Sequence, residues 1–180
     1  EDPGLQILPT HRILSAPSGL TAEKLLSAWA PACEFKTVTD SVRDPAGLTR
    51  REAPHDIAMY DAATDAFYTG TFKHRGILAK LSPDRSEAWR KLDLAYLHRY
   101  MIEDLLINGL LGGEKPTIAY SAFADKAKEM ALQARGVTIF VKPTIMEELR
   151  AVSLANDFMP QKSTYFFPKL ATGMVIHPLA

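Results

Sequence analysis

The chain has 180 residues, of which 47% are hydrophobic, and its 21 Lys and Arg residues balance 21 Asp and Glu residues. This length and apolar content fit one globular domain with a buried core, and they exclude a disordered or low-complexity chain. A zero net charge removes the general attraction of a basic protein for nucleic acids and anionic membranes. We therefore expect neither a membrane nor a nucleic acid as the partner, and any anion site must be local.

Cysteine usage and hydropathy both favour the cytoplasm. Cys33 is the only cysteine, so the chain holds no internal disulfide, as is usual in a reducing compartment. The longest apolar runs, such as residues 105–111, fall well short of the roughly 20 residues of a membrane helix. The sequence starts without Met and without a signal-peptide pattern. We expect one domain over residues 1–180, which is the C-terminal fragment of a longer cytoplasmic protein.

The first half of the chain combines short strands and short helices. Pro9 cannot donate a hydrogen bond to a neighbouring strand, so it marks an edge strand or a break. Five residues rich in Asp separate two strand-like segments and predict a β-hairpin. The predicted elements are, in chain order, a strand over 5–14, a helix over 21–30, a strand over 34–39, a short helix over 44–52 and hairpin strands over 57–60 and 66–72.

The second half begins with the longest helical pattern, over residues 86–111. Ser86 is a suitable N-cap, and the apolar positions wrap most of the helix surface, which predicts a central helix. Gly136 stands where a helix C-cap needs a positive φ. Strands over 117–121, 137–142 and 174–177 alternate with helices over 124–135 and 144–155. Right-handed crossovers in such a βαβαβ run predict a partly parallel, mixed sheet, in a single domain of the α+β or α/β class.

Two polar clusters near the ends of the chain are the best candidates for chemistry. They lie in residues 9–12 and in residues 159–169, where prolines stiffen the backbone around cations and hydroxyls. Cations beside hydroxyl donors are what phosphate or carboxylate recognition requires. If the clusters meet, they form an anion site, with His11 as the acid or base. The residues predicted to bind the anion are Thr10, Arg12, Lys162, Ser163, Thr164 and Lys169.

Each of these residues also has a purely structural interpretation. The aromatic residues 165–167 could anchor the core, both lysines could be solvated, and Arg12 could pair with a surface carboxylate. His98 lies on an apolar helical face and is expected to be a core histidine that is hydrogen-bonded to a backbone carbonyl. The sequence holds no metal-ligand spacing, no dinucleotide or nucleotide-binding glycine loop and no nucleophile elbow. It therefore predicts no metal and names no cofactor.

The terminal segments resemble a known family. Residues 4–12, Gly-Leu-Gln-Ile-Leu-Pro-Thr-His-Arg, and residues 159–169, Met-Pro-Gln-Lys-Ser-Thr-Tyr-Phe-Phe-Pro-Lys, are similar to signature segments of the bacterial and archaeal family called domain of unknown function 1015. Asp93-Leu94 with Leu97-His98, and Pro143-Thr144 with Glu147-Glu148-Leu149, resemble that family's middle region. The resemblance implies a protein about twice this length, whose N-terminal half carries a motif similar to one in ParB-like and related nucleotide-using proteins. The present chain then corresponds to the C-terminal half.

Two functions follow as hypotheses. In the first, the chain is half of an enzyme that binds a nucleotide or phosphorylated metabolite and transfers a phosphoryl or related group, acting by position and electrostatics. Its partners are a small phosphorylated or carboxylate ligand and the protein's own N-terminal half. In the second, it is a non-catalytic binding or assembly module that presents the aromatic residues 165–167 and the hairpin to a partner. DNA binding is a distant third, because the chain lacks both a positive net charge and a helix-turn-helix pattern.

Overall fold

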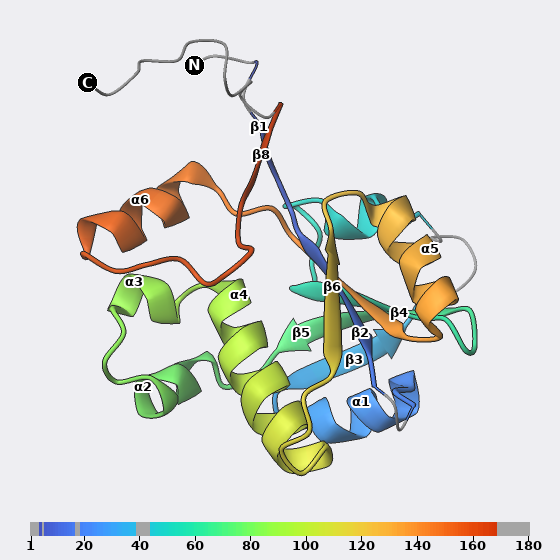
Figure 1. The fold of residues 1–180 in the computed structure, drawn as a ribbon. Coiled ribbons are helices and arrows are strands. Elements are labelled where there is room, and N and C mark those ends of the chain that lie inside the picture. Colours follow the sequence, from blue (N-terminus) through green and yellow to red (C-terminus); the bar gives the residue numbers. More distant parts are fainter. Residues whose placement is uncertain (1–3, 5, 17–18, 39–43, 169–180) are drawn as a thin grey trace, which may run out of the picture.

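A six-stranded antiparallel sheet forms the centre of the molecule (Figure 1). The computed structural model describes residues 4, 6–16, 19–38 and 44–168. The strand order is β3-β5-β4-β7-β2-β6. The strands are β2 (His11–Ser15), β3 (Cys33–Thr37), β4 (Ile57–Asp61), β5 (Ala66–Phe72), β6 (Thr117–Ser121) and β7 (Val137–Val141). The predicted hairpin is confirmed as β4 and β5, which pair from Ile57–Gly70 to Asp61–Ala66.

The predicted α+β class is confirmed, but the parallel pairing is wrong. Every strand pair in the described part of the chain is antiparallel. β6 and β7 are connected by α5 (Ala124–Ala134) and run in the same direction, as a βαβ unit requires. They are not neighbours, because β2 inserts between them and pairs antiparallel with both. β2, which forms the second part of the strand predicted over residues 5–14, therefore lies inside the sheet and not at its edge.

Helices cover both faces of the sheet, which gives two hydrophobic clusters. Leu14 of β2 packs in the larger cluster with α1 (Ala22–Trp29) and the long helical segment η3 (Tyr96–Leu110). Ile13, the preceding residue on β2, packs in the smaller cluster against α5. Successive residues of a strand point to opposite faces, so β2 is buried on both sides. In the described residues no helix is both long enough and apolar enough to cross a membrane.

The helix predicted over residues 86–111 is broken in the structure. Ser86 accepts a hydrogen bond from the backbone of Trp89 and begins α3 (Glu87–Arg90), as predicted. Leu92 has an extended backbone with ψ 132°, which ends this helix. A second helix starts at α4 (Asp93–Ala95) and continues with π-type hydrogen bonding as η3. Leu92 is buried, so tertiary packing overrides the helical pattern here. The remaining helical turns are η1 (Gly47–Thr49), where a longer helix was predicted, η2 (Arg75–Ile77) and α2 (Leu78–Leu81).

A two-stranded antiparallel ribbon joins the two ends of the described chain. β1 (Gln6–Leu8) pairs with β8 (Tyr165–Phe167), and Figure 1 shows the ribbon standing away from the six-stranded sheet. The strand is interrupted at Pro9, which separates β1 from β2, as the sequence predicts. β8 was expected to be a loop, and it follows α6 (Met146–Leu154). The strand predicted over residues 174–177 lies outside the described residues.

Gly136 is required for close packing and not for a positive φ. The positive φ at the end of α5 belongs to Arg135, at 49°. A Cβ atom on Gly136 would lie 2.3 Å from the carbonyl oxygen of Leu14. The glycine therefore lets the start of β7 approach β2, which fixes β2 in the middle of the sheet.

Candidate functional site

The two polar clusters from the chain ends lie together in the structure. The ribbon register places Leu8 opposite Tyr165, so the residues just after β1 lie beside those just before β8. The Thr144 hydroxyl, in the loop before α6, donates a hydrogen bond of 3.0 Å to the carbonyl oxygen of Ser163. Three segments that are distant in sequence therefore converge at the start of β8.

Arg12 is the centre of this junction. Its side chain is fully buried, with 0% exposure, and its guanidinium donates in three directions. Nη2 donates to the carbonyl oxygen of Lys162 at 3.1 Å, and Nη1 donates to the carbonyl oxygen of Thr10. Nε donates to Nε2 of His98 at 3.0 Å. Arg12 therefore ties both chain ends to the central helix.

Lys162 adds a second positive charge on the outer side of the junction. Arg12 and Tyr120 are paired residues of β2 and β6, so their side chains share one face of the sheet. The guanidinium carbon of Arg12 lies 5.8 Å from the centre of the Tyr120 ring, and the exposed Lys162 places its Nζ 5.9 Å from that centre. Among residues 4–168 as described, neither cation has a carboxylate within ion-pair distance. The described part of the junction therefore has two positive charges and no counter-charge.

Burial lowers the pKa of both groups on the inner side. It lowers the pKa of Arg12 to about 10, and the charge of Tyr120 acts in the opposite direction. Burial, together with the charge of Arg12, lowers the pKa of His98 to about 3. His98 is therefore neutral at physiological pH, and since its Nε2 accepts from Arg12, its proton resides on Nδ1. A neutral histidine can accept from Arg12 where a charged one would repel it.

His11 does not belong to this junction. It precedes Arg12 on β2 and points to the other face of the sheet, where its ring meets Phe140 edge to face at 5.2 Å. Its Nδ1 accepts a hydrogen bond of 3.3 Å from the backbone of Val141, and burial lowers its pKa to about 4. The structure therefore places His11 apart from the cluster in which it was predicted to act as the acid or base.

The remaining predicted residues fall into three groups. Ser163 is buried and donates its hydroxyl to the carbonyl oxygen of Pro160, so that hydroxyl is occupied. Thr10 is also buried and Thr164 is half-buried, and within the described residues neither hydroxyl has a hydrogen-bond partner. Lys169 lies outside the described residues. The groups that remain available to a ligand are the Lys162 ammonium and the two threonine hydroxyls.

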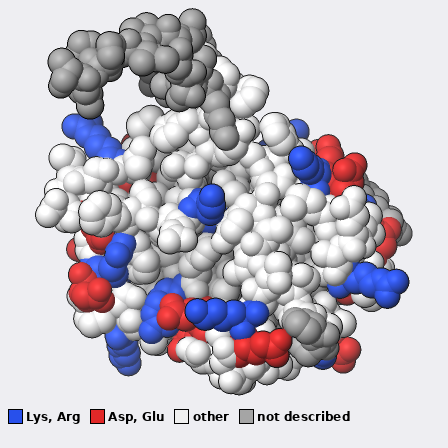
Figure 2. Space-filling model, in the orientation of Figure 1, with Lys and Arg blue, Asp and Glu red and all other residues white. Residues whose placement is uncertain are grey.

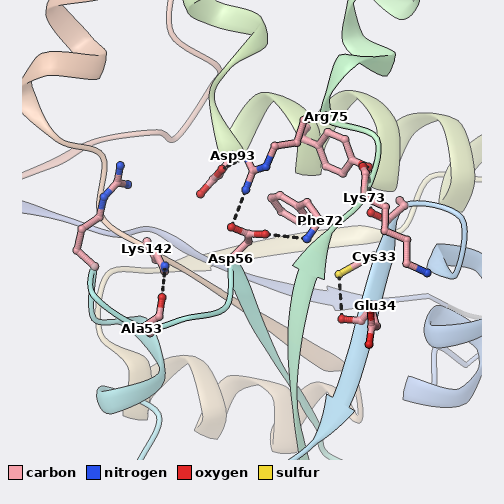
Figure 3. A network of polar contacts seen from close by, with 12 residues as sticks. Cys33, Glu34, Ala53, Asp56, Phe72, Lys73, Arg75, Asp93 and Lys142 are labelled. Carbon is pink, nitrogen blue, oxygen red and sulfur yellow. Dashed lines mark hydrogen bonds and ion pairs between the residues drawn. The ribbon is translucent and has the colours of Figure 1, made fainter.

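A second polar network, around Arg75, includes Asp93 at the start of α4 (Figure 3). Its charges contrast with those of the Arg12 junction. Arg75 donates to Asp56 and to Asp93, each at 2.6 Å, and Asp56 also accepts from the backbone of Phe72 at 2.7 Å. Burial acts to lower the pKa of Arg75, but the hydrogen bond and charge of Asp93 and the charge of Asp56 raise it overall. Burial raises the pKa of Asp93, and Arg75 offsets part of that shift. This arginine is neutralised within the chain.

The sequence did not identify three members of the junction. His98 was expected to bond a backbone carbonyl, Tyr120 was only a strand residue, and Thr144 was only a helix cap. His98 follows Leu94 by four residues, which places it on the buried face of the helix. This spacing was the one feature of the sequence that pointed to a buried role for His98. Strand order sets the partner of Tyr120, and no local pattern reveals it. No group of His, Cys, Asp and Glu side chains among the described residues could hold a metal ion.

Known proteins resemble this chain in fold and in part of its sequence. Three solved structures of point mutants of free serine kinase, two with AMP and one with ADP, have TM-scores of 0.51 to 0.52 and 8% sequence identity to it. The alignments cover 92% of this chain and 55% of each kinase chain, so the chain spans about half the length of those proteins. A comparison with curated proteins finds no match. The family model described as protein of unknown function (DUF1015) matches residues 1–95, more than half of the chain, and the chain belongs to this family.

Proposed function

We propose that this chain is the anion-binding half of an enzyme that acts on a nucleotide or a phosphorylated metabolite. Lys162 contacts the phosphate, and the hydroxyls of Thr10 and Thr164 complete its hydrogen bonds. The buried Arg12 contributes its positive charge beneath Lys162 and holds the backbone of Lys162 in place through its carbonyl oxygen. The enzyme works in the cytoplasm, and a preceding N-terminal half supplies the groups that carry out the reaction.

The observation that carries this proposal is a buried arginine that has no counter-charge among the described residues. Moving an ion from water into the protein interior is costly unless an opposite charge accompanies it. Arg12 has carbonyl oxygens and a neutral His98 as partners, and no carboxylate of the described chain pairs with it or with Lys162 beside it. A bound phosphate would balance both charges at once, because its oxygens accept several charge-assisted hydrogen bonds.

The backbone of Lys162 also suits this role. Its φ of 56° is a left-handed conformation that a residue with a long side chain adopts only when its surroundings hold it there. Arg12 holds its carbonyl oxygen, and the next residue is held by Thr144. The exposed ammonium is thus mounted on a fixed backbone, which lowers the entropy lost on binding a ligand.

The fold provides independent support. The chain shares its fold with free serine kinase, which binds ADP and AMP in the solved structures. Nucleotide binding is therefore compatible with this arrangement of helices and strands. The alternative, a non-catalytic binding module, is supported by Phe166 and Phe167, whose side chains are 39% and 43% exposed instead of buried in the core.

Calorimetric titration with ADP, AMP and inorganic phosphate tests the proposal. A charge-assisted hydrogen bond contributes about 1.5–3 kcal/mol, so Lys162→Ala is expected to weaken ADP binding by roughly tenfold or more. Lys36→Ala is the matched control, since Lys36 is an exposed lysine on β3 at the opposite edge of the sheet. ADP binding that is equal in the wild type, Lys162→Ala and Lys36→Ala proteins, or absent in all three, would favour the binding module.

A further inference from the structure

The exposed apolar side chains are concentrated in one stretch of the chain. Five of the eight large exposed hydrophobic residues in the described part of the chain fall within residues 146–167. They come from α6, the segment after it and β8. These residues are Met146, Leu154, Phe158, Phe166 and Phe167.

The most exposed of them are held in place by the fold. Leu154 is 76% exposed at the end of α6, and Phe158 is 80% exposed in the next segment. Asp157 accepts from the backbone of Ser86 at 2.8 Å and forms an ion pair of 2.9 Å with Arg85. The backbone beside Phe158 is therefore anchored to α3, while its ring points to solvent. A fixed and exposed aromatic ring is typical of an interface anchor.

The secondary structure in this region is only partly covered. A two-stranded ribbon is marginally stable in water without further strands or a covering layer, and within the described residues β1 and β8 pair with each other and with no other strand. Of the residues of α6, only Val152 is buried, so most of that helix is uncovered. Figure 1 shows α6 and the ribbon on the same side of the molecule, away from β3 and α1. Figure 2 shows that this side of the visible face carries few charged residues.

We propose that α6, residues 155–164 and the β1–β8 ribbon form the docking surface for the N-terminal half of a longer chain. We call this set of residues the docking surface. The solved kinase structures match this chain over 55% of their length, which leaves a segment of comparable size beyond the match. The ribbon contains β1, the first strand of the chain, so the start of the described chain lies at the docking surface. The exposed apolar side chains of this surface fit a permanent intramolecular partner better than a transient one.

This surface adjoins the Arg12–Lys162 junction. Lys162 and Thr164 belong to the segment between α6 and β8, so a docked half would cover the region from which their side chains emerge. Ligand sites form preferentially at such interfaces between domains. This consequence alone rests on the proposed function, and the docking surface itself does not.

Hydrogen exchange measured by mass spectrometry tests the docking surface. Exchange is compared between the 180-residue chain and the full-length protein that contains it. We expect peptides over residues 146–167 to exchange roughly tenfold or more slowly in the longer protein, because docking removes their local opening. Peptides over α5 serve as the internal control, since α5 packs against the opposite face of the sheet and carries an exposed Leu132.

Substitutions make the test specific. Leu154→Glu combined with Phe158→Glu is expected to remove the extra protection in the longer protein, while the matched control Leu132→Glu leaves it unchanged. Equal exchange of residues 146–167 in both proteins overturns the proposal. So does a dimer of the 180-residue chain that Leu154→Glu dissociates, because the occupant is then a second copy. The anion site is tested separately by titration of Lys162→Ala, so its failure is distinguishable from a failure of the docking surface.

Discussion

Two arginines in this molecule have opposite electrostatic environments. Arg75 has a side chain that is 46% exposed and bonds two carboxylates, whereas Arg12 is fully buried and has none within the described residues. The first network neutralises itself, so it needs no ligand and we assign it a structural role. The second holds a cation that the described chain does not neutralise. Comparing the two regions shows that the missing counter-charge, and not the presence of an arginine, marks the candidate site.

The largest expected effect comes from removing the buried arginine. Arg12→Ala leaves two backbone carbonyls and His98 without a donor and opens a cavity in the core. We expect the free energy of unfolding to fall by about 3 kcal/mol or more, measured by urea denaturation. Arg12→Lys keeps the charge but not the three-way geometry, and is expected to recover only part of the loss. A loss no larger than that of Arg75→Ala would contradict the central place of Arg12.

Acid is expected to weaken the Arg12 region. His98 and His11 have folded pKa values of about 3 and about 4, below the unfolded value of 6.5. Between these values the unfolded state binds more protons, so stability is complete above pH 6.5 and falls as the pH drops toward 4. We expect each of the two histidines to contribute a loss on the order of 3 kcal/mol by pH 4, and thermal melting measures this loss as a lower melting temperature. A melting temperature that is constant from pH 7 to pH 4 would be inconsistent with two buried neutral histidines.

The Arg75 network is expected to respond in the opposite direction. Burial raises the folded pKa of Asp93, so its carboxyl favours the folded state at low pH and this contribution is lost as the pH rises through the folded pKa. Arg75→Ala removes two partly exposed ion pairs and is expected to cost about 1 kcal/mol, since solvent screens such pairs. The cost is smaller at low pH, where Asp93 is protonated. Urea denaturation of this variant at pH 4 and pH 7 measures the difference, and a larger cost at pH 4 refutes it.

The smallest expected effect on stability is that of Lys162→Ala. Its side chain is exposed, and only its backbone carbonyl is bonded to Arg12, so the substitution keeps that bond. The free energy of unfolding is expected to change by no more than about 0.5 kcal/mol. Stability and binding are thereby separated, because the same variant is expected to lose ADP affinity. A large destabilisation would instead assign Lys162 a structural role.

Sequence patterns predicted the local elements better than their arrangement. The hairpin, the break at Pro9 and the helix capped by Thr21 depend on neighbouring residues, and the structure contains each of them. The insertion of β2 between β6 and β7 depends on contacts more than 100 residues apart in sequence, such as that between Leu14 and Gly136. No local pattern reports such contacts.

The candidate site was predicted to a similar extent. The sequence raised the meeting of the two chain ends only as a condition for an anion site, and the hydrogen bond from Arg12 to the Lys162 carbonyl oxygen joins those ends in the structure. Which side chains face a ligand could not be predicted, because that depends on strand register. His11 and Arg12 are consecutive residues of β2, and this places them on opposite faces of the sheet. The buried position of Ser163 could not be predicted either, because its hydroxyl donates to the carbonyl oxygen of Pro160 within the loop.

A crystal structure of the protein grown with ADP tests the central claim most directly. We expect a phosphate group within about 3 Å of Lys162 Nζ, close to the ring of Tyr120, with Arg12 still bonded to the Lys162 carbonyl oxygen. Phosphate bound at Arg75 instead, or a Lys162 side chain that extends into solvent with ADP bound elsewhere, would contradict the account.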